Sequence, residues 1–156
     1  MSGNLTRAAD IAGNTGTTSR TFYIDGTAPV LIVTYPNPGL SVNLLGLLNG
    51  LGANCTSSQS ACGTAIDPVS GTAFVDWNLQ RAILAEATMC MNGSGVYSTA
   101  NCSSFFGAAL SSSNWSVNVN PSTAYVGSFP TFTFKVHAAD SAGNTSADLT
   151  VTFTLL

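Results

Sequence analysis

The chain has 156 residues, which is enough for one well-buried domain with a short additional segment but too few for two full domains. Hydrophobic residues make up 45% of the chain and charged residues only 7%, so Ser, Thr, Asn and Gly must form most of the surface. The four basic residues are scattered singly, the formal net charge is −3, and no uncharged apolar run reaches the ~18 residues of a membrane span, which excludes a nucleic-acid partner and a transmembrane segment.

The first segment contains a phrase that returns near the end of the chain. "RAADIAGNT" at residues 7–15 recurs as "HAADSAGNT" at residues 137–145, with a constant offset of 130 residues and seven of the nine positions identical. The aspartate in each copy can accept hydrogen bonds from the backbone N–H groups that follow it, and the Gly-Asn pair tolerates positive φ. Each copy therefore predicts a sharp turn between two strands.

The next segments predict two strands and leave one stretch unassigned. "APVLIVTYPNPG" at 28–39 predicts a strand bounded by prolines, and its Val/Leu/Ile run indicates burial on both faces or packing under a loop. "LSVNLLGLLNGLGAN" at 40–54 is apolar without a period of two or 3.6, so it supports no assignment. "ACGTAIDP" at 61–68 predicts a short strand that ends at Asp67-Pro68, because proline has no N–H for a ladder.

The later strands alternate apolar and polar residues with a period of two, which is typical of half-buried strands. They lie at residues 73–81, 114–120, 131–139 and 149–155. Residues 83–110 fit either a long hairpin with a disulfide-pinned tip or a helical turn in "RAILAEATM". With turn-forming residues every eight to twelve positions or so, the pattern predicts an all-β sandwich of about 7–9 antiparallel strands, preceded by an N-terminal two-strand arm.

The four cysteines lie in Ser/Asn/Gly-rich stretches of loop character. Cys55, Cys62, Cys90 and Cys102 have 6, 27 and 11 residues between them, which does not match the tight Cys-x2-Cys pairs of a zinc site. We therefore expect disulfides formed in an oxidising compartment. Of the three pairings that four cysteines allow, we predict Cys55–Cys62 with Cys90–Cys102, because both close polar loops locally.

Three passages in chain order carry a resemblance to a known family. They are "IDGTAPV" at 24–30, "CGTAIDPVSGTAFVDWNLQR" at 62–81 and "TFKVHAADSAGNTSADLTVTFTL" at 133–155. In this order they resemble the bacterial immunoglobulin-like (Big-type) repeats of large secreted surface and adhesion proteins. The resemblance covers about residues 22–156, with departures in the cysteines and in residues 40–54. It implies an immunoglobulin-like domain over 25–156 and an arm over 1–24 that resembles the last strands of a preceding repeat.

The resemblance also implies a function. It is that of a non-enzymatic structural or adhesive module of an extracellular or cell-surface prokaryotic protein, with other copies, neighbouring repeats or glycans as partners. An alternative is a fibre-forming subunit whose arm adds strands to a neighbouring copy and builds a filament, because a lone hairpin is marginal in water. The apolar side chains expected at that interface are Leu5, Phe22, Tyr23, Ile24, Leu44, Leu45, Leu47 and Leu48.

Catalysis and metal binding have weaker support in the residues. His137 is the only histidine and falls on the solvent face of its strand, and the carboxylates are dispersed, so we expect no catalytic centre and no cofactor. Calcium is a weaker interpretation, because Asp25, Asp10 and Asp140 offer hard oxygen ligands without the dense spacing of a dedicated calcium loop.

Carbohydrate binding is a further, weaker alternative from another class of protein. Aromatic rings would serve as its platforms, but the alternation of residues puts both tryptophans in the core. The rings to test are Trp77, Trp115, Tyr97 and Tyr125.

Overall fold

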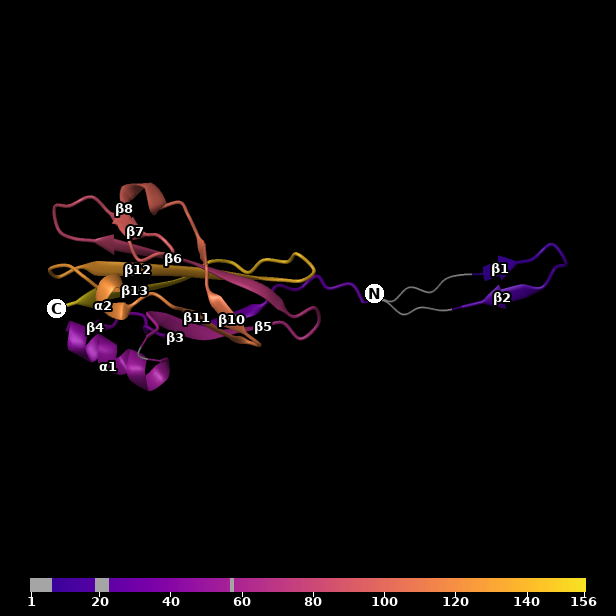
Figure 1. Cartoon of the computed structure of the whole chain (residues 1–156), viewed down its shortest axis with the longest axis horizontal. Coiled ribbons are helices and arrows are strands. Elements are labelled where there is room, and N and C mark those ends of the chain that lie inside the picture. The colour runs from indigo at the N-terminus through magenta and orange to yellow at the C-terminus, as the bar shows by residue number, and fades with distance from the viewer. Residues whose placement is uncertain (1–6, 19–22, 57) are drawn as a thin grey trace.

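The computed structural model describes residues 7–18, 23–56 and 58–156, and it is an all-β sandwich with 43% strand and 12% helix (Figure 1). One sheet has the spatial order β10 (Ala109–Ser111), β11 (Asn114–Val117), β5 (Ala61–Ile66) and β3 (Val30–Tyr35). The other runs β4 (Ser41–Val42), β13 (Leu149–Leu155), β12 (Thr131–Asp140), β6 (Thr72–Ala82), β7 (Met89–Met91) and β8 (Tyr97–Ser98), and β9 (Phe106–Gly107) also pairs with β6.

Three helices and a separate hairpin complete the described chain. The helices are α1 (Leu44–Asn54), the short α2 (Pro121–Ala124) and the 3-10 helix η1 (Thr99–Asn101). The hairpin consists of β1 (Arg7–Ala9) and β2 (Thr15–Thr17), which pair only with each other. It lies beyond the end of the sandwich at which residues 23–29 enter, which we call the linker end, whereas Leu156 lies at the opposite end (Figure 1).

The predicted alternation along β12 is confirmed. Phe132, Phe134, Val136 and Ala138 are buried, while the residues between them on the other face are only half-buried. The strand pairs with β6 over its whole length, and the register shifts at a bulge between Ala139 and Asp140, at the linker end. The other alternating strands also point large side chains into the core, namely Val75, Trp77, Leu79, Trp115, Val117, Val151, Phe153 and Leu155.

Aromatic rings hold the two sheets together. Trp115 of the four-stranded sheet stacks on Phe134 of the other sheet with ring centroids 6.1 Å apart. The ring of Tyr125 meets Phe132 edge-on at 5.3 Å, and its hydroxyl donates to the carbonyl oxygen of Ser60. Gly63 lies under Trp115, where a Cβ atom would overlap both the indole and the Ile32 carbonyl oxygen, so only glycine fits there.

Strand β3 differs from the sequence-based expectation of burial on both faces. Its pattern alternates, and Val30 and Ile32 are exposed although Tyr35 is buried. The reason is that only one face of β3 packs on the core, through Leu31 and Val33, while Val30 and Ile32 lie on the other face of this edge strand. The outer face of this sheet near β3 therefore carries apolar side chains that no described residue covers.

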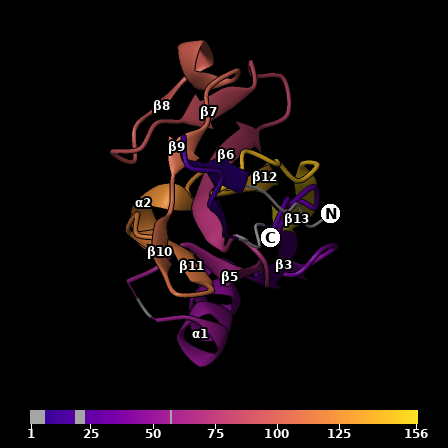
Figure 2. The ribbon, with the colours of Figure 1, turned by 90° about the vertical axis from the view of Figure 1, so that its right-hand side faces the viewer.

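The unassigned apolar stretch 40–54 forms the short strand β4 and helix α1. The Asn43 side chain caps the helix by accepting a hydrogen bond of 2.8 Å from the Gly46 N–H. Leu47 and Leu51 are fully buried, and the helix contacts β3 and β4, which are the edge strands of the two sheets. Helix α1 thus closes one side of the sandwich, opposite the β7–β8 hairpin (Figure 2).

Both predicted disulfides are present. Cys55–Cys62 joins the end of α1 to β5, and Cys90–Cys102 joins β7 to the residue after η1. Residues 83–110 adopt the hairpin interpretation through β7 and β8, and residues 81–89 contain no helical turn. In the described part of the chain, no helix is long and apolar enough to cross a membrane.

The helix α1 offers a direct test of this packing. Replacing the buried Leu47 by Ala removes side-chain volume from a filled site, so we expect the free energy of unfolding to fall by about 2–5 kcal/mol in urea denaturation. Leu45→Ala is the matched control, because Leu45 is 67% exposed and its loss changes stability by no more than about 0.5 kcal/mol. Equal effects of the two substitutions would contradict the observed orientation of α1.

Candidate functional site

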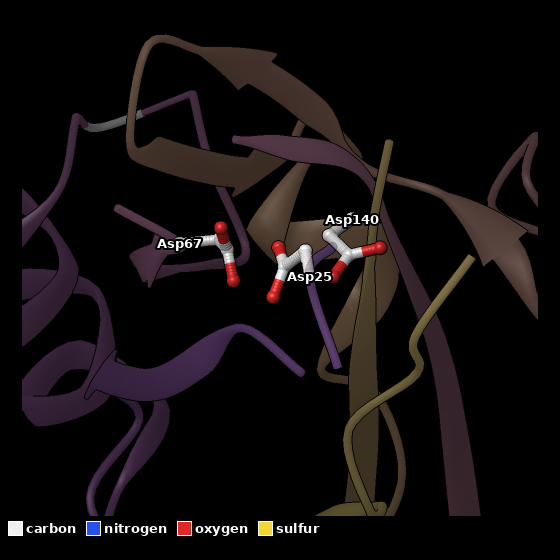
Figure 3. A group of neighbouring side chains, drawn as sticks. All are labelled: Asp25, Asp67 and Asp140. Carbon is white, nitrogen blue, oxygen red and sulfur yellow. The ribbon is translucent and has the colours of Figure 1, made fainter. Parts of the chain in front are cut away.

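Three aspartates from distant parts of the chain meet at the linker end of the sandwich. Asp25 lies in the linker, Asp67 follows β5 of the four-stranded sheet, and Asp140 ends β12 of the other sheet. Their carboxylates offer ligand atoms that all lie within 4.8 Å of one another (Figure 3). Figure 3 shows the Asp25 carboxylate between the other two. We call these three residues the acidic cluster.

Asp67 is held by the turn that joins β5 to β6. Its Oδ1 accepts backbone hydrogen bonds from Val69, Ser70 and Gly71 at 2.9, 2.8 and 3.2 Å. The residue is only 9% exposed. Its other oxygen, Oδ2, is buried and has no hydrogen-bond partner.

Asp140 is held by the β12–β13 turn and is 3% exposed. Its Oδ1 accepts from the backbone N–H groups of Ala142 and Asn144, and its Oδ2 accepts from the Asn144 side-chain amide at 2.7 Å. Burial raises the pKa of Asp140, but the bonds from Asn144 and Ala142 lower it by more, so the net pKa lies below the ordinary value. The same Asn144 amide donates to the Asp25 carbonyl oxygen at 3.2 Å and ties the linker to this turn.

Asp25 is a well-stabilised anion in the linker. The Ser70 hydroxyl lies near enough to lower its pKa, and the backbone N–H and hydroxyl of Thr27 donate to Oδ1, which together hold the pKa of Asp25 at about 2. Neither Asp25 Oδ2 nor the Ser70 hydroxyl, however, makes a hydrogen bond of good geometry. Within the described residues, no Lys or Arg forms an ion pair with any of the three carboxylates.

Sequence reasoning found two members of the cluster and missed the third. It grouped Asp25 and Asp140 with Asp10, but Asp10 lies in the β1–β2 hairpin and is not part of the cluster. The sequence places Asp67 only at the end of the strand 61–68, which does not indicate that its Oδ2 faces other carboxylates without a hydrogen-bond partner. The sequence does hold one indication of the cluster. Asp67 comes at the end of one strand, Asp140 at the end of another, and Asp25 shortly before the first strand of the sandwich, so all three can lie at the same end of the sheets.

The β1–β2 turn and the β12–β13 turn have the same hydrogen bonds. Asp10 N donates to Asn14 O at 3.0 Å and Asn14 N donates to Asp10 Oδ1 at 2.8 Å. The corresponding bonds between Asp140 and Asn144 are also 3.0 and 2.8 Å long. In both turns the glycine has positive φ, 87° at Gly13 and 94° at Gly143. The two copies of the sequence repeat therefore form turns of the same structure.

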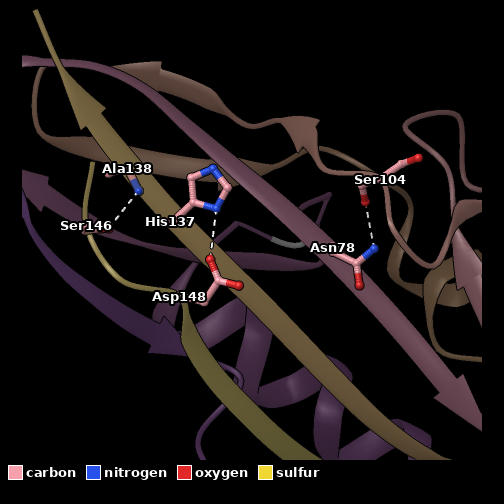
Figure 4. Close-up of polar contacts among 6 residues, drawn as sticks. All are labelled: Asn78, Ser104, His137, Ala138, Ser146 and Asp148. Carbon is pink, nitrogen blue, oxygen red and sulfur yellow. Dashed lines mark hydrogen bonds and ion pairs between the residues drawn. The ribbon is translucent and has the colours of Figure 1, made fainter. Parts of the chain in front are cut away.

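His137 lies beside a carboxylate on the other face of β12, away from the core. Its Nδ1 is 3.1 Å from Asp148 Oδ1, and the Phe105 ring lies 4.5 Å from the imidazole (Figure 4). The side chain is 19% exposed, so the predicted solvent-facing position is correct for the face of the strand, but Phe105 covers part of it. Nearby, the Asn78 amide donates to the Ser104 carbonyl oxygen at 2.7 Å and fastens the segment after η1 to β6.

The rings considered as platforms for carbohydrate are not on the surface. Trp77, Trp115 and Tyr125 are at most 2% exposed. Tyr97 is partly buried, with Arg81 over its ring at 4.4 Å and its hydroxyl bonded to the Ala124 carbonyl oxygen. None of the four offers an open face on which a sugar could stack.

The apolar residues predicted at an assembly interface divide into three groups. Leu5 and Phe22 lie outside the described residues, whereas Tyr23 and Ile24 are exposed in the linker and Leu44 and Leu45 are exposed on α1. Leu47 cannot contribute to an interface, because it is fully buried, and Leu48 is half-buried against the core. The reason is that the helical period turns these two side chains toward the gap between β3 and β4.

Comparisons of the chain with protein-family models, curated proteins and solved structures gave no match. The class that the fold defines is an all-β sandwich with two disulfides and a preceding hairpin. Function is therefore inferred from the geometry of the molecule itself.

The low pKa of Asp25 predicts how stability depends on pH. Because Asp25 is deprotonated more readily in the folded chain than in the unfolded one, its contribution is complete above about pH 4 and is lost as the pH falls toward 2. We expect Asp25→Asn to lower the melting temperature at pH 6 in the presence of a chelator, and to lose less stability than the wild type between pH 4 and pH 2.

Asp10→Asn is the control for this measurement. Asp10 makes similar hydrogen bonds, but in the separate hairpin, so this variant should follow the wild-type pH profile of the sandwich. A profile of Asp25→Asn that parallels the wild type from pH 6 to pH 2 would show that the Asp25 carboxylate does not stabilise the fold.

Proposed function

We propose that this chain is a structural module of a tandem array of immunoglobulin-like sandwiches in an extracellular or cell-surface protein. Residues 1–24 are the last strands of a preceding module, and residues 25–156 are the next. The observation that carries the proposal is the equivalence of the β1–β2 and β12–β13 turns, with matching bonds between Asp10 and Asn14 and between Asp140 and Asn144.

The pairing beside the two turns supports the same interpretation. In the hairpin Ala9 lies opposite Thr15, and in the sandwich Ala139 forms a bridge with Thr145. In the sandwich Ala139 belongs to β12, and Thr145 lies between β12 and β13, the last two strands, which pair with each other. Strand β12 also pairs with β6 on its other side. The hairpin has the form of this terminal pair without the rest of a sandwich around it.

The direction of the chain also suits a linear array. The linker joins the sandwich at one end and Leu156 lies at the other (Figure 1). The β1–β2 turn lies at the far side of the hairpin from the sandwich, as the β12–β13 turn lies at the far side of the sandwich from Leu156. Modules joined in this way follow one another head to tail.

An extracellular position is supported by the cysteines and the surface. All four cysteines are paired in two disulfides, which persist in oxidising compartments. The surface is built from uncharged polar residues, and no catalytic function is needed to explain the three carboxylates or the His137–Asp148 pair. The module is thus proposed as a non-enzymatic spacer or adhesive unit.

A second candidate is a fibre-forming subunit whose hairpin adds to a neighbouring copy. The observation that favours it is that β3 pairs with β5 alone and carries the exposed side chains of Val30 and Ile32, together with the full exposure of Ile11 in the hairpin. Head-to-tail addition of this kind does not close on itself and would produce a filament.

Deleting residues 2–24 distinguishes the two candidates. For a spacer module, the full chain is monomeric by light scattering, and the deletion shifts the melting temperature by no more than about 2 °C, since the described hairpin contributes no strand to either sheet. For a fibre subunit, the full chain forms polymers in electron micrographs, and the deleted form does not. Loss of folding on deletion would contradict both, because it would make the arm part of this sandwich.

A further inference from the structure

We propose that the acidic cluster of Asp25, Asp67 and Asp140 binds one calcium ion, which fixes the linker to the sandwich. The inference deepens the proposed tandem-module function, because the site lies where a preceding module would be joined. It rests on the positions of the three carboxylates and on buried oxygen atoms that no described group satisfies.

The unsatisfied oxygens are the first argument. Asp67 is more than nine-tenths buried, and its Oδ2 has no hydrogen-bond donor although its Oδ1 accepts three. Asp25 Oδ2 is also buried, and the Ser70 hydroxyl near this carboxylate makes no hydrogen bond of good geometry. Leaving a buried carboxylate oxygen unpaired is costly, and buried charges in proteins are usually paired or coordinate a metal. Both atoms belong to the group of facing carboxylates (Figure 3).

The spacing of the carboxylates is the second argument. Oxygen atoms from the three residues lie within 4.8 Å of one another. Calcium binds oxygen at about 2.3–2.6 Å, so one ion can reach two oxygens that are about 4.8 Å apart on opposite sides of it. Magnesium needs bonds of about 2.0–2.1 Å in near-ideal octahedral geometry, which this set of oxygens suits less well.

The local charge is the third argument. Three carboxylates converge, and in the described chain none of them is paired with a Lys or Arg side chain. The ligand set contains only oxygen, with no histidine or cysteine, which favours a hard cation such as calcium over zinc.

A bound ion would connect three separate parts of the molecule. Asp67 belongs to the four-stranded sheet and Asp140 to the other sheet, and both are held rigidly by their turns. Asp25 belongs to the linker, which is also held near this point by the bond of 3.2 Å from the Asn144 amide to the Asp25 carbonyl oxygen and by the nearby Ser70 hydroxyl. Calcium would therefore set the direction in which the linker leaves the sandwich.

The test uses the full chain, treated with a chelator and then titrated with calcium chloride. With three carboxylate residues at an extracellular module, we expect a dissociation constant on the order of 10⁻⁴–10⁻³ M by calorimetry. At about 10 mM calcium the melting temperature should rise by about 3–6 °C. Sodium chloride at the same ionic strength should produce no such rise, which separates binding from screening.

Asp67→Asn and Asp25→Asn should each weaken calcium binding at least about a hundredfold, which reduces the temperature shift at about 10 mM calcium to about 2 °C or less. Asp10→Asn is the matched control, because Asp10 lies in the equivalent turn of the hairpin and is not part of the acidic cluster. This variant should keep the full temperature shift with calcium. If Asp67→Asn does not fold, Asp25→Asn decides, since Asp25 lies in the linker outside both sheets.

Two outcomes would overturn the calcium site. One is the absence of binding heat and of any temperature shift up to about 10 mM calcium, well above the expected dissociation constant. The other is an equal shift in the wild type, Asp67→Asn and Asp25→Asn, which would place the ion elsewhere. Neither outcome affects the tandem-module proposal, because that proposal is tested by the deletion of residues 2–24, which leaves all three aspartates of the acidic cluster in place.

Discussion

The packing of aromatic rings between the two sheets is the constraint on which the rest of the molecule depends. With 7% charged residues, the chain has few ion pairs to draw on, and in the described part the one such pair is His137–Asp148. Instead, Trp115 of the four-stranded sheet stacks on Phe134 of the other sheet at 6.1 Å, and Phe132 packs against Tyr125, whose hydroxyl bonds the Ser60 carbonyl oxygen beside β5. Because these rings fix the separation of the sheets, they also fix where the turns at the linker end come together.

The two turns that hold Asp67 and Asp140 meet the linker at the linker end of the sandwich. The bulge at Ala139–Asp140 ends the ladder with β6 and begins the turn that holds Asp140, and the β5–β6 turn holds Asp67 in the same way. In each turn, backbone N–H groups donate hydrogen bonds to Oδ1 of the aspartate. The Oδ2 atom of Asp67 has no hydrogen-bond partner. The core positions the turns, the turns position the carboxylates, and the carboxylates face the linker.

The strands with a clean alternation could be predicted from the sequence, since each half-buried strand carries its own pattern, as in the buried Phe132 and Phe134 of β12. The two disulfides could also be predicted, because each joins cysteines that are close in the sequence and closes a short polar loop. Helix α1 could not, because its Gly-rich apolar segment has no clear period and gains its structure from packing between β3 and β4. The acidic cluster could not either, because Asp25, Asp67 and Asp140 are brought together only by the closing of the two sheets.

The opposite positions of the linker and Leu156 determine how the molecule responds to a pulling force. Strands β3 and β13 both run from the linker end toward the other end, so tension applied at the two ends acts along them (Figure 1). Antiparallel ladder bonds lie perpendicular to the strands, so the bonds between β13 and β12 are loaded in shear and share the load together. The disulfides enclose only sequence separations of 7 and 12 residues, so most of an unfolded module remains free to extend.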